Sequence, residues 1–322
     1  GKKLKKTILI TGGSGFLGKR LAISLKKEYN IILSGRNNKQ NMLAKKFSDC
    51  EVIPMDVVNI ESVRDAIIST KPDIIIHAAA TKFVDMAENQ PMECIDVNVI
   101  GSQNVARVAA ERNVEIVIGI STDKASPPVR NTYGLSKAIM ERVFCSMNNK
   151  TKTKFTCVRY GNVAWSTGSV LPIWKKMHSE TGLIGTTGPE MRRFFFTVDE
   201  AVKLVITAMN KIDEVQGKVL SRKMKAAQIE DILKIWVDQF GGSWEQIEGR
   251  PGERNDEYLI GDLELPYTYE INYNGIDHYI ISFNEKPKES IEVGLSSANT
   301  DRLTEEEIIG IISNPPEEEL AN

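Results

Sequence analysis

Short apolar runs recur along the first half of the chain, and polar stretches with helical spacing separate them. The runs at residues 7–11, 31–33, 51–55, 72–76 and 114–120 are rich in β-branched side chains and too short for typical helices. This pattern predicts buried strands. Strands that alternate with helical segments indicate βαβ units, so we expect an α/β fold with a parallel sheet.

The second half of the chain has a looser pattern. Residues 155–163 predict one more strand, and residues 226–240 have the spacing of an amphipathic helix. The alternating run at 267–283 surrounds Asn274-Gly275, which is typical of a type I′ hairpin turn.

A glycine-rich turn follows the first predicted strand without a break, and a helical pattern comes directly after it. Glycines at this spacing, between a strand and a helix, let the backbone approach a pyrophosphate at the helix N-terminus. The turn therefore predicts a dinucleotide site of the Rossmann type, with these candidate residues: Gly12, Ser14, Gly15, Phe16, Leu17 and Gly18.

These patterns together predict two domains. We expect residues 1–165 to form an NADP-binding Rossmann domain, a doubly wound parallel sheet, with residues 190–212 packing back on it. Residues 166–322 would mainly form a smaller α/β domain that binds the substrate.

The end of the second predicted strand bears on the choice of cofactor. No acidic residue stands there to bind a ribose 2′-hydroxyl. Ser34 and Arg36 instead suit the 2′-phosphate of NADP, because a guanidinium matches phosphate geometry. The alternative is that Arg36 is a solvated loop residue.

Other strand ends add candidates for the cofactor site. A carboxylate after the third strand can meet an adenine amino group, and small residues after the fourth strand let the backbone lie against a cofactor. The candidates are Asp56, Val57, Ala78, Ala79, Ala80 and Asn98, the last near the start of a helix.

The most informative stretch follows the fifth predicted strand. Thr122, Asp123 and Lys124 stand at its end, and Tyr133 and Lys137 lie at i and i+4 of the next predicted helix. Ligands of open α/β sheets bind at this edge. The Lys137 ammonium can lower the pKa of Tyr133, which suits that phenol to accept a proton. The alternatives are an incidental Tyr-x-x-x-Lys on a surface helix and a surface ion pair at Asp123-Lys124.

Composition narrows the function classes. With 322 residues, 41% hydrophobic residues and a net charge of -2, the chain has no basic excess that would suggest nucleic acid. No apolar run reaches membrane-spanning length and no signal peptide is evident, so we expect a cytoplasmic protein without membrane contact. The four cysteines are far apart, which favours reduced core cysteines over a metal site.

With these motifs the chain resembles the extended short-chain dehydrogenase/reductases. Within them it is similar to the soluble inverting UDP-N-acetylglucosamine 4,6-dehydratases of the pseudaminic acid pathway, over nearly its whole length. The resemblance rests on the glycine turn from Thr11, Ser-Thr-Asp-Lys-Ala from Ser121, Tyr-Gly-Leu-Ser-Lys from Tyr133, Arg-Tyr-Gly-Asn-Val from Arg159, Arg193-Phe194 and Arg-Pro-Gly-Glu from Arg250. Ordinary epimerases of this superfamily lack the Ser-Thr-Asp-Lys run.

The resemblance implies a mechanism. Tyr133 would remove the proton of the sugar 4-hydroxyl while hydride passes from carbon 4 to NADP, and hydride would later return to carbon 6. Lys124 would act at carbon 5, and Asp123 would protonate the leaving 6-hydroxyl. Thr122 would orient the substrate or help tune the phenol of Tyr133, and Lys137 would support both the cofactor and Tyr133.

The resemblance also implies residues that bind the UDP-sugar. Arg250 and Glu253 match positions that hold the diphosphate and ribose. Arg193 and Asn162 match substrate contacts, and Lys82 would line the same cleft or reach the cofactor. Alternatively, Arg193 caps a nearby helix pair, and Glu253 forms a salt bridge with Arg250.

Three departures from the family pattern bear on the sugar and on stereochemistry. The connection from Lys124 to Tyr133 is one residue longer than expected, Arg192 replaces a small hydroxyl residue, and Trp165 follows Arg-Tyr-Gly-Asn-Val-Ala. Other readings are a retaining 4,6-dehydratase, a 5,6-dehydratase with an exocyclic enol-ether product, a nucleotide-sugar 4-epimerase or a non-catalytic NADP-binding scaffold. We expect a homo-oligomer.

Overall fold

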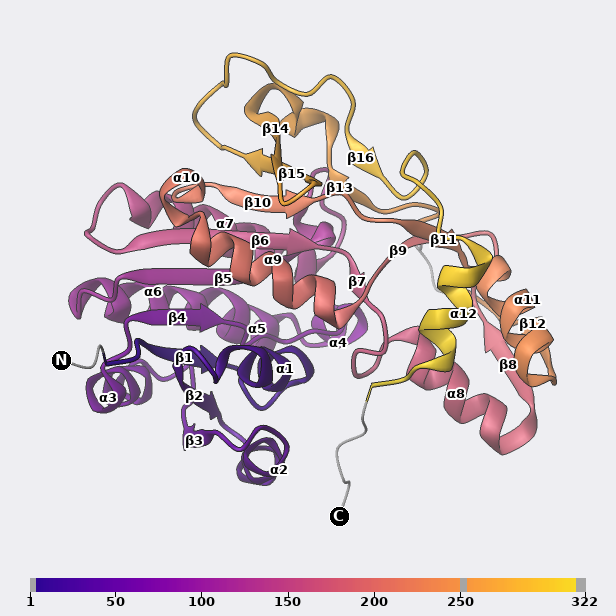
Figure 1. Ribbon diagram of the computed structural model, residues 1–322, viewed down its shortest axis with the longest axis horizontal. Coiled ribbons are helices and arrows are strands. Elements are labelled where there is room, and N and C mark those ends of the chain that lie inside the picture. Colours follow the sequence, from indigo (N-terminus) through magenta and orange to yellow (C-terminus); the bar gives the residue numbers. More distant parts are fainter. Residues whose placement is uncertain (1–3, 250–253, 317–322) are drawn as a thin grey trace.

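A parallel sheet forms the centre of the protein. In the computed structural model, which describes residues 4–249 and 254–316, this sheet has nine strands in the order β14-β15-β10-β6-β5-β4-β1-β2-β3 (Figure 1). The strands are β1 (Thr7–Thr11), β2 (Asn30–Gly35), β3 (Glu51–Pro54), β4 (Ile74–His77), β5 (Ile116–Thr122), β6 (Lys154–Tyr160), β10 (Val219–Arg222), β14 (Thr268–Tyr273) and β15 (Ile276–Ile281). The run from β3 to β10 is parallel, whereas β15 and β14 pair antiparallel. The order β3-β2-β1-β4-β5-β6 is that of a Rossmann fold, which confirms the predicted α/β class.

Helices cover both faces of the sheet. One face carries α1 (Phe16–Leu25), α2 (Asn38–Ser48) and α9 (Val198–Asn210), and the other carries α3 (Ile60–Thr70), α6 (Gly101–Glu111) and α7 (Thr132–Asn148) (Figure 1). Because both faces are covered, the central strands are mostly apolar, and Ile8, Leu9 and Ile10 of β1 are fully buried. The segment before α6 consists of α4 (Val84–Asn89), α5 (Pro91–Cys94) and the π-helix η1 (Ile95–Ile100).

A smaller lobe lies beyond the carboxyl ends of the strands (Figure 1). It contains the pairs β8 (Leu183–Thr186) with β12 (Ser243–Gln246) and β13 (Tyr258–Ile260) with β16 (Leu295–Ser296), and the sheet of β7 (Asn162–Val163), β9 (Arg192–Phe196) and β11 (Ala226–Gln228). Its helices are α8 (Val170–Thr181), α11 (Ile229–Phe240) and α12 (Glu305–Ser313). A second apolar core fills this lobe, where the rings of Trp174 and Trp236 meet edge to face at 6.3 Å.

The main sheet takes strands from both parts of the chain. β10, β14 and β15 come from the range expected for the substrate domain, and α9 packs against β5 and β6. The connection between β9 and β10 also includes the short helix α10 (Ile212–Val215). The division at residue 165 stays a prediction.

Some predicted element bounds need correction. The helix expected at 226–240 begins at Ile229, because Ala226–Gln228 pairs with β9 as β11. The strand expected at 155–163 divides into β6 and β7, which belong to different sheets. The hairpin at 267–283 is confirmed as β14 and β15, and Asn274 and Gly275 both have the positive φ of a type I′ turn, 56° and 81°.

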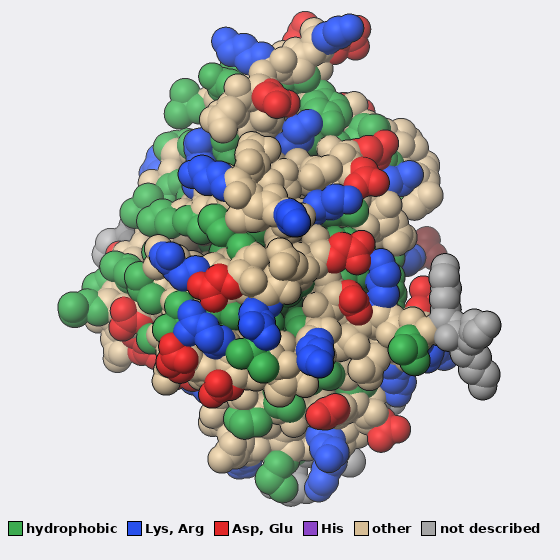
Figure 2. Space-filling model, turned by 90° about the vertical axis from the view of Figure 1, so that its left-hand side faces the viewer, with side chains coloured by type: hydrophobic (Ala, Val, Ile, Leu, Met, Phe, Trp, Pro, Cys, Tyr) green, Lys and Arg blue, Asp and Glu red, His purple; other side chains and the backbone are tan. Residues whose placement is uncertain are grey.

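Charges of both signs mix on the face at the amino ends of the strands (Figure 2). Cys50, Cys94, Cys145 and Cys157 are buried and unpaired, as predicted. No helix within 4–249 and 254–316 is long and apolar enough to cross a membrane.

Candidate active site

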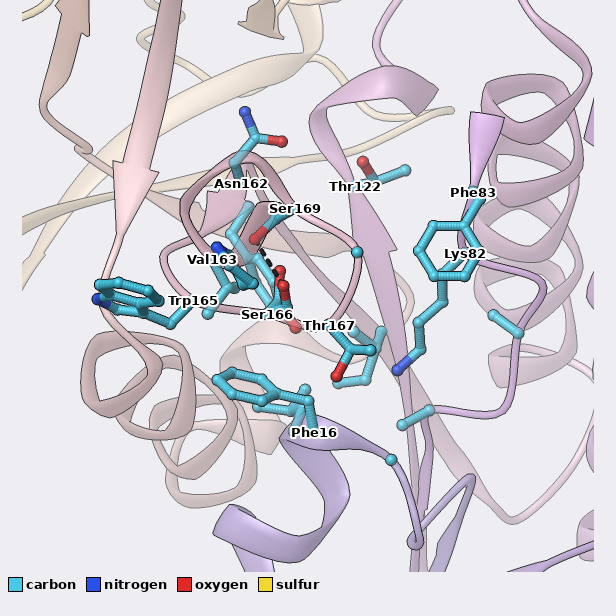
Figure 3. A pocket seen from close by; sticks show the side chains of 18 of the residues that line it. Phe16, Lys82, Phe83, Thr122, Asn162, Val163, Trp165, Ser166, Thr167 and Ser169 are labelled. Atoms are coloured by element: carbon cyan, nitrogen blue, oxygen red, sulfur yellow. Dashed lines mark hydrogen bonds between the residues drawn. The ribbon is translucent and has the colours of Figure 1, made fainter. Parts of the chain in front are cut away.

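A cleft of about 1170 Å³ opens where β1, β4, β5 and β6 end. The turn before α1, the segment at 78–85, the end of β5, the start of α7 and the loop at 160–169 line it (Figure 3). Thus the structure places the ends of the central strands and both predicted motifs in one cavity, at the edge where α/β sheets bind ligands.

The glycine turn is closely packed at its base and open toward the cleft. Gly12 has φ +62°, and a Cβ there would lie 2.6 Å from the backbone N of Ala79. A Cβ on Gly18 would lie 2.6 Å from Gly13 Cα. Gly15 caps α1 without a side-chain hydrogen bond, and the first turn of α1 holds no acidic residue. The free N–H groups at this helix end fit a dinucleotide pyrophosphate.

Lys82 extends toward the same turn from the segment after β4 (Figure 3). Its Nζ lies 3.2 Å from the position that a Cβ on Gly15 would take. Ala78 and Ala80 also line the cleft, and the N–H groups of Ala78 and Ala79 donate to Thr11 Oγ1 at 3.1 and 3.2 Å. This geometry suits Lys82 to contact a phosphate group at the turn.

The predicted 2′-phosphate residues lie in different surroundings. Ser34 is fully buried, and its hydroxyl donates to the Ile10 carbonyl at 3.1 Å. Arg36 is at the surface, 3.5 Å from Glu93. The structure therefore leaves the side chain of Arg36, and not that of Ser34, accessible to a 2′-phosphate. Asn41, which the sequence did not single out, donates from Nδ2 to the Gly35 carbonyl at 2.8 Å. Its Oδ1 is buried and finds no hydrogen-bond partner in the described part of the chain.

Three other predicted cofactor residues hold the surrounding backbone. Asp56 Oδ1 accepts from Val58 N–H at 3.1 Å, and Val57 packs against Gly101. Asn98 is fully buried, accepts from Thr81 N–H at 2.7 Å and donates to Ser136 Oγ at 2.9 Å. Asn98 therefore joins the Lys82 segment to α7, and none of the three lines the cleft.

The predicted catalytic side chains come together at the end of β5. Thr122, Lys124, Tyr133 and Lys137 line the cleft, while Asp123 lies just behind them with 2% of its surface exposed. Asp123 Oδ1 accepts from Thr122 Oγ1 at 3.1 Å and lies 3.5 Å from Lys124 Nζ. Asp123 Oδ2 is buried and has no hydrogen-bond partner among the residues that the structure describes.

Local cap residues fix where these side chains begin. Asn131 Oδ1 accepts from Gly134 N–H at 2.7 Å and so starts α7 one residue before Tyr133. Thr122 Oγ1 accepts from Lys124 N–H at 3.2 Å and starts the 3-10 turn η2 (Asp123–Ala125). The two caps fix where η2 and α7 begin, and Lys124 and Tyr133 both line the same cleft. They do so although the segment between them is one residue longer than expected.

Burial dominates the electrostatics of the site. It raises the pKa of Asp123, which favours the protonated carboxyl. Burial alone would lower the pKa of Lys124, but the Asp123 and Glu257 carboxylates outweigh it and raise that pKa. Burial also lowers the pKa of Lys137 to about 8.

The predicted tuning of Tyr133 needs correction. Burial raises the pKa of Tyr133 to about 12, and the ammonium that opposes this most is that of Lys124. The expectation that Lys137 lowers this pKa does not hold in this structure, because the loss of solvent costs the phenolate more than neighbouring charges return.

The substrate residues expected in the second half have mixed positions. Asn162 lines the cleft. Arg193 instead binds the backbone of a neighbouring segment, donating from Nη2 to the Arg254 carbonyl at 2.8 Å, with Nε 3.8 Å from Glu257 Oε1. Arg250 and Glu253 lie outside the described residues.

The structure also adds residues that the sequence did not reveal. Glu257 reaches the Arg193 side chain and raises the pKa values of both Asp123 and Lys124. Across the cleft, Phe83 touches the loop at 166–169, because a Cβ on Gly168 would lie 2.2 Å from Phe83 Cε1. No sequence signal marked Glu257 beyond its place shortly after the Arg-Pro-Gly-Glu turn.

The unusual Arg192 and Trp165 both have structural partners. Arg192 Nε donates to Asp256 Oδ1 at 2.7 Å. Trp165 has φ +68°, and its Nε1 donates to the Ile311 carbonyl of α12 at 2.8 Å. Within 4–249 and 254–316, no group of three or more His, Cys, Asp or Glu side chains could hold a metal ion.

Fold and site together are those of the extended short-chain dehydrogenase/reductases, of the nucleotide-sugar dehydratase and epimerase type. The chain belongs to the family described as "Polysaccharide biosynthesis protein", whose model matches residues 8–275. This confirms the resemblance inferred from the motifs.

Curated relatives of two activities resemble the chain. It is 36% identical to a UDP-N-acetylglucosamine 4,6-dehydratase (inverting) of Campylobacter jejuni, over 84% of the chain and 83% of the relative. It is 34% identical to a UDP-glucose 4-epimerase of Rickettsia bellii, over 98% of each chain. Among solved structures, Pen from Bacillus thuringiensis superposes with a TM-score of 0.86 at 28% identity, over 96% of this chain and 97% of that one. Identity alone does not separate dehydratase from epimerase.

Proposed function

We propose that the protein dehydrates a UDP-sugar with NADP as cofactor, and that its reaction is 4,6-dehydration of UDP-N-acetylglucosamine with inversion at carbon 5. The observation that carries this is the carboxyl of Asp123, buried beside Lys124 and behind the cleft that holds Tyr133. Epimerisation at carbon 4 needs only one proton acceptor and donor. Elimination of a hydroxyl needs a second acid–base pair, one group for the carbon 5 proton and one for the leaving oxygen.

Each side chain has a role that its surroundings support. Tyr133 accepts the proton of the 4-hydroxyl, and Thr122 and Lys124 work against the burial that raises its pKa. The chemistry that bound NADP would supply here is acceptance of hydride from carbon 4 and its return to carbon 6. Asp123, whose pKa is raised by burial, gives its proton to the leaving 6-hydroxyl.

Lys124 acts at carbon 5, where the 4-ketone acidifies the proton. The amine of Lys124 takes this proton as the 6-hydroxyl leaves as water with the proton of Asp123. The Asp123 and Glu257 carboxylates raise the pKa of Lys124, so they stabilise the ammonium that forms, and this ammonium can later return a proton to carbon 5. Inversion requires the proton to return to the face of the ring opposite to the one it left. We propose inversion because the mobile stem of Lys124 can present the returning proton to that opposite face.

The cofactor and substrate follow from the cleft. The turn before α1, Lys82, Tyr133 and Lys137 would hold NADP, and Arg36 would meet its 2′-phosphate. The exposed ion pair of Arg36 with Glu93 is of a kind worth roughly 0–1 kcal/mol, so a phosphate can displace Glu93. Asn162, which lines the cleft, would bind the UDP-sugar. Arg250 and Glu253, which lie outside the described residues, would hold its diphosphate and ribose, as the family resemblance implies.

NMR of the product made from UDP-N-acetylglucosamine in deuterium oxide tests this proposal. We expect a 4-keto-6-deoxy sugar nucleotide with deuterium and the L-arabino configuration at carbon 5. The D-xylo configuration would make the enzyme retaining, an exocyclic methylene would indicate a 5,6-dehydratase, and an N-acetylgalactosamine product would indicate an epimerase. No product at all would favour a non-catalytic scaffold.

We also propose a homo-oligomer. Apolar side chains are exposed on α5, η1 and α7: Met92 at 80%, Ile95 at 45%, Leu135 at 53% and Ile139 at 45%. Light scattering coupled to gel filtration would give the mass in solution, and a monomeric mass would contradict the proposal.

A further inference from the structure

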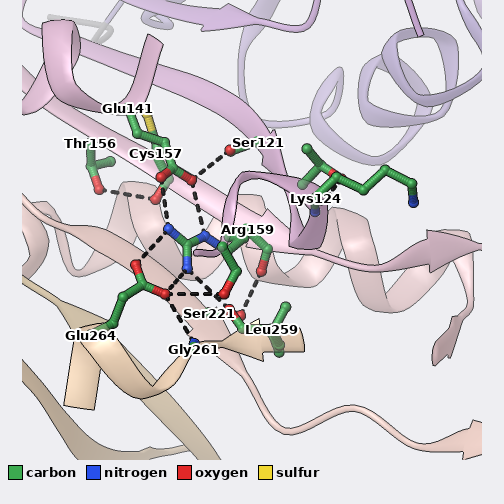
Figure 4. Close-up of polar contacts among 12 residues, drawn as sticks. Ser121, Lys124, Glu141, Thr156, Cys157, Arg159, Ser221, Leu259, Gly261 and Glu264 are labelled. Atoms are coloured by element: carbon green, nitrogen blue, oxygen red, sulfur yellow. Dashed lines mark hydrogen bonds and ion pairs between the residues drawn. The ribbon is translucent and has the colours of Figure 1, made fainter. Parts of the chain in front are cut away.

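A buried ionic network lies directly behind the catalytic side chains. Its centre is Arg159 at the end of β6, which has no exposed surface (Figure 4). The guanidinium lies between two carboxylates, Glu141 of α7 and Glu264 of the 3-10 helix η3 (Asp262–Tyr267). The proposed mechanism assigns no role to any of the three residues.

The network is fully hydrogen-bonded around Arg159. Nε and Nη2 donate to Glu141 at 3.0 and 2.7 Å, and Nη1 and Nη2 donate to Glu264 at 2.8 and 3.0 Å. Nη1 also donates to the Leu259 carbonyl at 3.0 Å. Five donated hydrogen bonds use the full capacity of a guanidinium, so its position is closely determined.

Glu141 connects this centre to both catalytic segments. It lies on α7, on the same helix as Tyr133 and one turn beyond Lys137. Its Oε2 also accepts from Ser121 Oγ at 2.6 Å, and Ser121 directly precedes Thr122. The Glu141 carboxylate therefore fixes the position of the end of β5 relative to α7. Lys124 follows β5 and Tyr133 lies on α7, so this contact also fixes how these two side chains lie relative to each other.

Glu264 links Arg159 to the chain segment that runs from Lys124 to Tyr133. Its Oε1 accepts from Ser126 Oγ at 3.2 Å and from Gly261 N–H at 3.2 Å. Gly261 lies so close that a Cβ there would be 2.0 Å from the Pro127 carbonyl oxygen. The connection that is one residue longer than expected is thus seated on the segment around Gly261.

We propose that Glu264 is a positioning residue of the active site: through Arg159 and Ser126 it holds the segment from Ser121 to Pro127 against α7, and so sets Asp123 and Lys124 relative to Tyr133. This rests on the proposed function for its kinetic consequence. A second carboxylate on a guanidinium that Glu141 already neutralises leaves an excess buried negative charge, which is costly to the fold and has little purpose as a stabilising bridge alone.

Glu264→Gln tests this, because it removes the charge and keeps the size of the side chain. We expect kcat to fall by about 10- to 100-fold, since misplacement by about 1 Å can cost 10²-fold in rate. KM for UDP-N-acetylglucosamine and the content of bound cofactor should change by less than about threefold, because neither site contains Glu264. The matched control is Asp256→Asn, which breaks the ion pair with Arg192 on the same segment and should leave kcat within about twofold.

Two milder variants keep the proposal testable if Glu264→Gln does not fold. Ser126→Ala removes only the bond to Glu264, and Ser121→Ala removes only the bond to Glu141. Each should lower kcat more than KM changes. A lower melting temperature with unchanged kcat in all three variants, or an equal loss of kcat in Asp256→Asn, would overturn the proposal.

Hydrogen–deuterium exchange separates failure of this proposal from failure of the proposed function. In Glu264→Gln, amides in residues 121–133 should exchange faster than in the parent protein, and in Asp256→Asn they should not. This result would support the positioning role even if the parent protein made no dehydrated product. Unchanged exchange in Glu264→Gln would contradict it, whatever reaction the enzyme catalyses.

Discussion

The two halves of the cleft are built in different ways. The cofactor half comes from one continuous stretch, in which β1, the glycine turn and α1 follow each other within residues 7–25. The acid–base half brings together the ends of β5 and β6, the start of α7 and the segment at 254–264. The first half depends on backbone conformation and the second on side-chain contacts between distant residues.

This difference predicts how each half fails. A change in the cofactor half should alter binding of the cofactor, because the glycine turn and Lys82 face the cleft there. A change in the acid–base half should alter rates while the cofactor stays bound. Four substitutions test this comparison, in order of expected effect.

Tyr133→Phe should lower the rate of carbon 4 oxidation by about 10²- to 10⁴-fold, the range typical of lost general acid–base catalysis. The phenol ring stays, so the fold and the bound cofactor should be unchanged. Stopped-flow absorbance of the reduced nicotinamide measures the step, and Tyr258→Phe, on a 39% exposed tyrosine, is the control. Near-normal oxidation would show that Tyr133 is not the proton acceptor.

Asp123→Asn should separate oxidation from elimination. The amide keeps the shape of the carboxyl but cannot donate its proton to the leaving hydroxyl, so overall turnover should fall by about 10²- to 10³-fold. Tyr133 remains, and reduced cofactor should therefore accumulate with a 4-keto intermediate. Absorbance and mass spectrometry would follow both species, with exposed Asp262→Asn as control. Loss of oxidation as well would place Asp123 in the first step.

Gly12→Ala should damage the cofactor half instead. At φ +62° the new Cβ would meet the backbone of Ala79 at 2.6 Å, so the turn must move. We expect the cofactor to bind at least about 10-fold more weakly, because misplaced N–H groups lose their contacts with the pyrophosphate. Fluorescence titration with NADPH measures this.

Gly310→Ala is the matched control for Gly12→Ala. Gly310 lies within α12, and a Cβ there meets nothing within 4 Å. This change should raise the free energy of unfolding by roughly 0.5–1 kcal/mol and leave NADPH affinity unchanged. If Gly12→Ala bound NADPH normally, the cofactor half would not depend on backbone conformation as we argue.

Sequence patterns predicted the glycine turn and the parallel strands β1 to β6 because their signals are local, whereas β10 was not predicted. The turn at Gly12, the strand periodicity and the Asn274-Gly275 hairpin each depend on neighbouring residues. The placement of Glu257 and Glu264 was not predictable, since no local pattern marks a carboxylate that folds back onto β6 or Arg193. For the same reason the inward hydroxyl of Ser34 and the raised pKa of Tyr133 were missed: burial is set by distant segments.

Arg36→Ala should have the smallest effect, and it tests whether the cofactor half prefers NADP to NAD. Arg36 is 61% exposed and its ion pair with Glu93 spans 3.5 Å, so stability should change by less than about 0.5 kcal/mol. The loss of the contact between the guanidinium and the 2′-phosphate should weaken NADPH binding by about 10-fold, the equivalent of one charge-assisted hydrogen bond, and leave NADH binding unchanged.

Glu93→Gln is the matched variant, because it frees Arg36 and should strengthen NADPH binding by a few-fold without affecting NADH binding. Parallel titrations with both cofactors measure the ratio. Equal weakening of NADPH and NADH, or NAD alone released from the denatured parent protein, would show that Arg36 does not select NADP.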